Sequence, residues 1–279
     1  MTRRAQFIFD AIYELDSATL LTLLQLELLT GGRALQTRDE ESDTPLHAAI
    51  MAYDKAAAPD WLECIRMLLA AGADPNARDD EGVSPLHRLV ITQSRSEQCS
   101  DVLAGMQMLL EAGADVELAD IDGWSPLISA ACYNGAYLVP ALLRAGADVN
   151  VRDSQGRTAL SHAAGNSAAV VGMLVSSGAD PNARDAWGHT PLYYAEQACD
   201  CSRFCHPESV VQALLAAGAV SLEQRRRLLD EENSELPRKR QCELLSLHRS
   251  GTYYKPRATK SRKKWIDIRG DIMIKESHA

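Results

Sequence analysis

The stretch GADPNARDDEGVSPLH (residues 72–87) recurs in variant form along the 279-residue chain. Every copy follows a leucine-rich segment and places a glycine 13 residues before a proline or alanine. A fixed period of about 33 residues is typical of stacked repeats, in which each unit buries its apolar face against its neighbours. The five complete copies are GRALQTRDEESDTPLH (32–47), GADPNARDDEGVSPLH (72–87), GADVELADIDGWSPLI (113–128), GADVNVRDSQGRTALS (146–161) and GADPNARDAWGHTPLY (178–193).

Each block of the repeat has a physical role. The glycine after the leucine pair supplies the left-handed residue that ends a helix. The aspartate and glycine that follow favour a tight hairpin, which we call a finger. The Thr or Ser before the proline is placed to cap the next helix, and proline at the first helical position sacrifices no hydrogen bond. The five finger aspartates, which number fingers one to five, are Asp39, Asp79, Asp120, Asp153 and Asp185.

These blocks resemble the ankyrin repeat, whose T-P-L-H, small-residue pair, L-L and G-A-D-x-N-x-x-D-x-x-G elements are matched in order over about residues 30–220. The resemblance implies an all-α fold: an ankyrin-repeat solenoid of helix pairs with β-hairpin fingers. It also implies that the protein binds a partner through the concave face and the fingers, and that His47 and His87 have structural roles.

Departures from the pattern define the expected domains. Residues 1–32 form an N-terminal capping helix pair, and residues 33–220 hold the five repeats. Residues 221–236 are expected to form a capping helix, followed by a basic, partly disordered tail over 237–279. The first, second and fifth repeats carry insertions, expected as polar loops, near residues 53–60, 93–100 and 199–206.

Charge is divided unevenly along the chain. Residues 221–279 hold 15 Lys and Arg against 9 Asp and Glu, a net charge of +6, whereas residues 1–220 hold 14 against 29, a net charge of −15. Within the tail, residues 237–257 include RQCELLSLHRSGTYYKP, which is similar to the N-terminal part of a bacterial insertion-sequence transposase. This resemblance implies a bacterial source and a gene-fusion or frameshift remnant, because the catalytic core of such an enzyme has no room here.

The chain carries no P-loop, GxSxG, HExxH or dinucleotide-binding fingerprint, so we expect no enzymatic activity and no cofactor. Seven scattered cysteines favour a reducing compartment over a disulfide framework. One cluster of three cysteines and a histidine within eight residues is a candidate metal site, because thiolates and imidazole are ligands that zinc prefers. Four ligands so closely spaced in sequence cannot easily adopt tetrahedral positions around one ion. A surface loop with reduced cysteines is therefore the preferred interpretation. The cluster is Cys199, Cys201, Cys205 and His206.

Candidate partner-binding residues flank the finger aspartates or lie on the adjacent helices. Acidic residues dominate the early fingers and steer basic partners, and tryptophans in the later fingers are typical of binding hot spots. In the alternative interpretation the acids are a solvated face and the tryptophans fold onto their own hairpins. The candidates are Glu40, Glu41, Asp43, Asp80, Glu81, Trp124, Tyr133, Arg157, Trp187 and His189.

Taken together, these features predict a non-enzymatic, monomeric scaffold that binds an unidentified protein, with a basic surface on that partner as one possibility. The alternative is a regulatory or nucleic-acid-associated protein that uses residues 237–279. A metal-dependent enzyme is a third, less favoured alternative. No membrane segment is expected. The expected location is cytoplasmic, or a host cell if the source is an intracellular bacterium.

Overall fold

A computed structural model describes residues 3–14, 17–30, 33–39, 42–52, 58–93, 99–133, 135–197, 207–220, 264–266 and 272–274. Glu40, Glu41, the cysteine and histidine cluster at 199–206, the expected capping helix at 221–236 and the transposase-like segment at 237–257 lie outside these residues.

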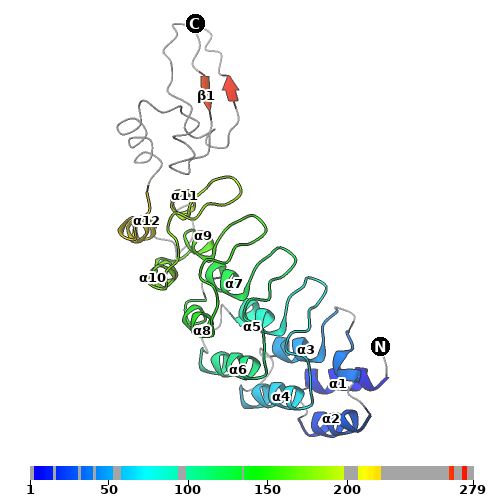
Figure 1. Ribbon diagram of the computed structural model, residues 1–279. Coiled ribbons are helices and arrows are strands. Elements are labelled where there is room, and N and C mark those ends of the chain that lie inside the picture. Colours follow the sequence, from blue (N-terminus) through cyan, green and yellow to red (C-terminus); the bar gives the residue numbers. More distant parts are fainter. Residues whose placement is uncertain are drawn as a thin grey trace.

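The described part of residues 3–220 is a solenoid of helix pairs (Figure 1). The inner helices contact one another in sequence along the stack. They are α1 (Arg3–Glu14), α3 (Pro45–Met51), α5 (Pro85–Gln93), α7 (Pro126–Cys132), α9 (Ala159–Ala163) and α11 (Pro191–Gln197).

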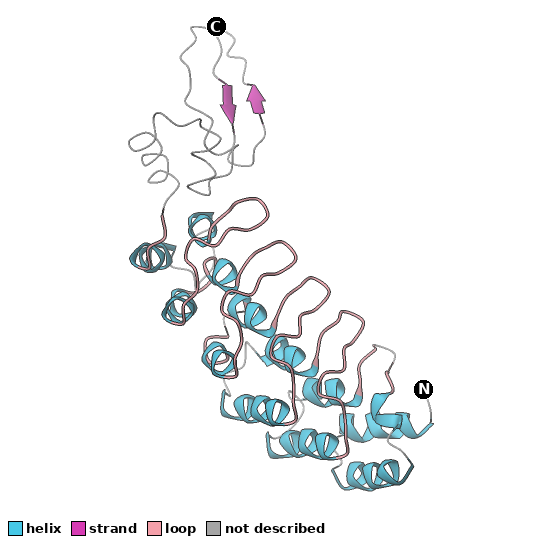
Figure 2. Ribbon diagram, in the orientation of Figure 1, coloured by secondary structure: helices cyan, strands magenta, loops and turns pink. Residues whose placement is uncertain are grey.

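The outer helices form a second row, and fingers connect successive repeats on the side of the inner helices (Figure 2). A short 3-10 helix, η1 (Arg33–Gln36), contacts α1, α2 and α3. The outer helices are α2 (Ser17–Thr30), α4 (Ala58–Ala70), α6 (Cys99–Glu111), α8 (Val139–Arg144), α10 (Ala168–Ser176) and α12 (Pro207–Ala216). The sequence prediction of an all-α solenoid is thereby confirmed.

Local chemistry fixes the helix ends as the sequence predicts. The hydroxyl of Ser125 accepts a hydrogen bond from the backbone N–H of Ile128 at 3.3 Å and so caps α7, which begins at Pro126. At the other end of an outer helix, Gly72 has φ +90°, a conformation that costs glycine little. The N–H groups of Gly72 and Ala73 then donate to the carbonyls of Leu69 and Leu68, which closes the end of α4.

The fingers are joined edge to edge by main-chain hydrogen bonds. One carbonyl at the tip of each of fingers two, three and four accepts an N–H from the next finger at 2.9 to 3.0 Å. The neighbours approach so closely that a Cβ atom at Gly123 would lie 2.7 Å from the backbone nitrogen of Ser154, so this position requires glycine. The bonded pairs are Ile121 with Glu81, Ser154 with Asp122, and Ala186 with Gln155.

Stacking buries a continuous core of aliphatic side chains between repeats. Leu68, Leu109 and Leu142, which end the outer helices, are each 0% exposed. Alanine pairs on the inner helices, such as Ala130 and Ala131, are also fully buried and allow close helix approach. The low aromatic content of the sequence is therefore compatible with a well-packed interior.

Two features differ from the sequence expectations. The insertions near 53–60 and 93–100 are not wholly loops: residues 58–60 and 99–100 extend α4 and α6, which reach 13 residues each, whereas α8 has six. In the tail, β1 (Lys264–Ile266) and β2 (Ile272–Ile274) pair antiparallel, a hairpin that the sequence analysis did not anticipate.

Candidate protein-interaction site

The predicted acidic residues divide into exposed and buried groups. Asp80 and Glu81 are exposed at the tip of finger two, and Asp122 is exposed at the tip of finger three. We call these three residues the fingertip acids. Asp43 is only 3% exposed and lies 3.8 Å from Arg88 of the next repeat, so its side chain belongs to the repeat interface rather than to the surface.

The finger aspartates are structural. Oδ1 of Asp153 accepts hydrogen bonds from the backbone N–H groups of Gln155 and Arg157 at 2.9 and 2.8 Å. Its Oδ2 atom accepts from Arg157 Nε at 2.8 Å and contacts His162 Nε2 at 3.0 Å. Burial alone would raise the pKa of Asp153, but these hydrogen bonds outweigh it and lower the pKa. Arg157, a predicted binding residue, is thus engaged in holding finger four.

Other arginines of the fingers are occupied by backbone carbonyls. Arg78 donates from Nε to Gly82 at 3.0 Å and from Nη2 to Ala119 at 2.6 Å, which ties finger two to finger three. Arg152 makes the equivalent link to Gly156 and Arg184. Arg78 and Arg152 therefore have a structural role, while the fingertip acids face solvent and place negative charge at the tips of fingers two and three.

The two predicted tryptophans differ in environment. Trp124 is half-buried and packs edge-on against His162, with 4.6 Å between ring centroids, and lies 6.4 Å from the ring of the half-buried Tyr133. Trp187 is 53% exposed at the tip of finger five. Trp124 is therefore partly used in packing against helical residues of its own and the next repeat, whereas Trp187 is exposed.

His189 belongs to a row of aromatic rings at the end of the stack. Its ring lies 4.0 Å from that of Tyr193 with an interplanar angle of 8°, and 6.3 Å from that of Trp187. Sequence reasoning did not assign Tyr193, Tyr194 or His162 to the site. The spacing in the sequence could have identified two of them, because the residue nine positions after a finger aspartate contacts the carboxylate of that aspartate. Tyr194 contacts Asp185 in this way, and His162 contacts Asp153.

Other candidate chemistry in the described residues is structural. Nε2 of His47 is 3.1 Å from the Val83 carbonyl, and Nε2 of His87 is 2.7 Å from the Ser129 hydroxyl. Burial raises the pKa of the Cys132 thiol, which disfavours the reactive thiolate. Within the described ranges no group of three or more His, Cys, Asp or Glu is arranged to hold a metal, and no described helix is long and apolar enough to cross a bilayer.

Acidification should destabilise the fold, because burial lowers the pKa of His87 to about 4. The unfolded chain, with a histidine pKa near 6.5, then binds the proton first as the pH falls. The associated stability is present above about pH 6.5, is lost progressively down to about pH 4 and amounts to roughly 3 kcal/mol. Urea unfolding at pH 7 and pH 4.5 measures the loss. A His87→Asn variant should lose less stability over this interval, and an equal loss would contradict the assignment.

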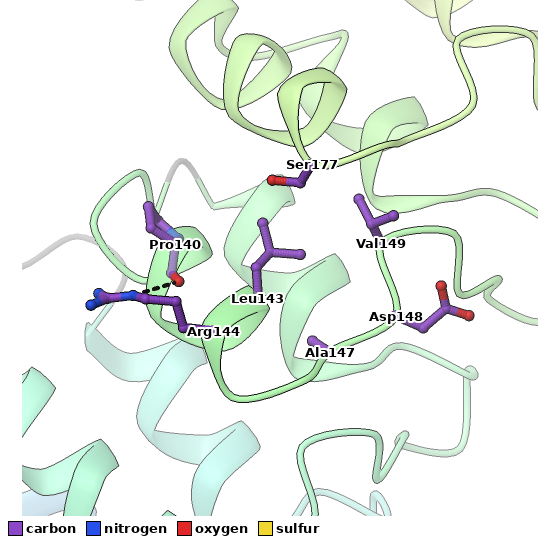
Figure 3. A pocket seen from close by; sticks show the side chains of 7 residues that line it. All are labelled: Pro140, Leu143, Arg144, Ala147, Asp148, Val149 and Ser177. Atoms are coloured by element: carbon purple, nitrogen blue, oxygen red, sulfur yellow. Dashed lines mark hydrogen bonds between the residues drawn. The ribbon is translucent and has the colours of Figure 1, made fainter.

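A hollow of about 580 Å³ lies on the outer side of the stack, at the C-terminal ends of α8 and α10 (Figure 3). Arg144 at its edge donates from Nε to the carbonyl of Pro140 at 3.1 Å. Its walls include the aliphatic side chains of Leu143 and Val149 and the charged side chain of Asp148, and no buried polar side chain among the lining residues points into it. The hollow therefore offers no catalytic constellation, and the fingertips remain the stronger candidate.

Stacked helix pairs with main-chain-bonded fingers define a repeat solenoid, a class of protein-binding fold. A family model for ankyrin repeats, each match holding three copies, covers residues 55–153, 100–185 and 131–225. These matches together span residues 55–225, more than half of the chain. The chain therefore belongs to the ankyrin-repeat family.

A curated relative is the E3 ubiquitin-protein ligase KEG of Arabidopsis thaliana, 44% identical over 63 residues. The aligned part is 23% of this chain and 4% of that relative. The similarity thus covers a short segment of a much longer protein.

Proposed function

We propose that this chain is a non-enzymatic scaffold that binds a basic segment of a partner protein through its fingertips and the aromatic rings beside them. The observation that carries the proposal is the charge of the fingertips, where Asp80, Glu81 and Asp122 are exposed while Arg78 and Arg152 are bonded to backbone carbonyls. Exposed acids on a fixed edge attract cationic partners and accelerate their association.

The family supports this function, because a stack of repeats presents an extended surface without supplying reactive groups. The ligase activity named for the Arabidopsis relative belongs to that longer protein. The acidic composition of residues 1–220 supports a protein partner over nucleic acid, since acidic surfaces repel phosphates.

The test compares two variants that remove the same charge. In one, Asp80→Asn, Glu81→Gln and Asp122→Asn neutralise the fingertip acids. In the control, Glu63→Gln, Glu111→Gln and Glu208→Gln remove three charges from the outer helices α4, α6 and α12. A protein captured by the immobilised full chain is then studied by association kinetics at low salt.

We expect the fingertip variant to slow association by about tenfold, and the control to change it by less than about twofold. The difference should shrink as salt is added, because screening weakens exposed charges. Equal slowing in both variants would show only a general charge effect and would contradict a fingertip site.

A further inference from the structure

We propose that Trp187, His189 and Tyr193, at the end of finger five and the start of α11, form a stacking site for an arginine side chain of the partner's basic segment. We call these three residues the aromatic row. The inference rests on the proposed function and adds a specific requirement to it: the partner must present arginine rather than lysine at this point.

Asp185, whose side chain is fully buried, forms the contacts that position finger five beside the aromatic row. Its Oδ1 atom accepts the backbone N–H groups of Trp187 and His189 at 2.9 and 2.8 Å. Its Oδ2 atom accepts the hydroxyl of Tyr194 and lies 3.3 Å from Nδ1 of His189. The backbone of finger five and the ring of His189 are therefore already ordered when a ligand arrives, which lowers the entropic cost of binding.

The aromatic surface of the row suits a planar cation. Trp187 is 53% exposed, the largest exposed fraction of any aromatic side chain in the described residues. The nearly parallel rings of His189 and Tyr193 extend the surface toward α11. A guanidinium stacks on such faces while its edge N–H groups remain available to acceptors, whereas an ammonium acts as a point charge.

A main-chain carbonyl within the row could accept one of those N–H groups. The carbonyls of Glu81, Asp122 and Gln155 each receive an N–H from the next finger. Trp187 occupies the next position in this series, and no N–H from the described part of the chain reaches its carbonyl. With respect to the described residues, this carbonyl is therefore an open main-chain acceptor at the end of the series of bonded fingers.

Charge favours a cation at the same place. Glu196 is exposed one helical turn after Tyr193 on α11, a spacing that puts both side chains on one side of the helix. The cation of finger four, Arg157, is already paired with Asp153 at 2.8 Å. An arginine over the row thus meets a carboxylate and, among the described residues, an open carbonyl.

The experiment measures fluorescence anisotropy of two labelled peptides with the full chain. One peptide carries three arginines separated by Gly-Ser pairs, and the other carries lysines at the same positions. We expect the arginine peptide to bind about fivefold more tightly or better. Trp187→Ala should bring the ratio of the two dissociation constants close to one, Trp187→Phe should keep most of the preference, and Leu21→Ala, an exposed apolar change on α2, should leave it unaltered.

The outcomes separate this inference from the function on which it rests. The fingertip variant described above should weaken both peptides by the same factor and leave their ratio unchanged. Equal affinity for the two peptides, or a preference that survives Trp187→Ala, overturns the arginine site while leaving the scaffold function standing. Failure of both peptides to bind at low salt overturns both.

Discussion

Replacing Trp61 with alanine should lower the free energy of unfolding by about 3–5 kcal/mol, because the change removes the largest fully buried side chain of the described core. Trp61 lies on α4, and its indole N–H donates to the carbonyl of Ala49 on α3 at 2.9 Å. Its ring fills the space above Gly105 on α6, where an added Cβ would lie 2.7 Å from the ring. One side chain thus joins three helices from two repeats.

Urea denaturation followed by circular dichroism measures this effect. Trp187→Ala is the matched control, because the same atoms are removed from an exposed position and the expected change is within about 0.5 kcal/mol. Similar losses in the two variants would show that Trp61 is not part of the repeat interface.

Asp153→Ala should also lower the free energy of unfolding by about 3–5 kcal/mol, since it leaves the half-buried Arg157 and two backbone N–H groups without their acceptor. Asp120→Ala provides the comparison. Asp120 accepts the backbone N–H groups of Asp122 and Trp124 but has no arginine or histidine bonded to it, and burial raises its pKa. Its removal should therefore cost less, about 1–3 kcal/mol. If the two variants were equally stable, the Arg157 and His162 contacts would contribute nothing.

Features that depend on neighbours in sequence could be predicted well. The Ser125 cap and the glycine that ends α4 follow from local backbone chemistry, which a short motif encodes completely. The same holds for fingers two to five, because the aspartate of each bonds to N–H groups two and four residues ahead. Recurrence of these motifs was sufficient to define the solenoid.

The stacking of apolar faces between repeats was predictable, but the exposure of individual polar and aromatic side chains at these contacts was not. Asp43 stands in an acidic run, yet Arg88, 45 positions later, lies against it at the repeat interface. The sequence suggests that Trp124 is an exposed fingertip residue, but the ring of His162 of the next repeat packs against it. Exposure at such positions is set by the identity of a residue about 40 positions away, and no pattern within one repeat reports it.

Hydrogen exchange of the full chain, alone and saturated with its captured partner, tests the binding account most directly. We predict slower exchange in residues 79–83, 120–124 and 185–193, where the fingertip acids and the aromatic row lie, and unchanged exchange in the outer helices α4 and α6. Protection confined to the outer helices, with the fingers unaffected, would contradict the account.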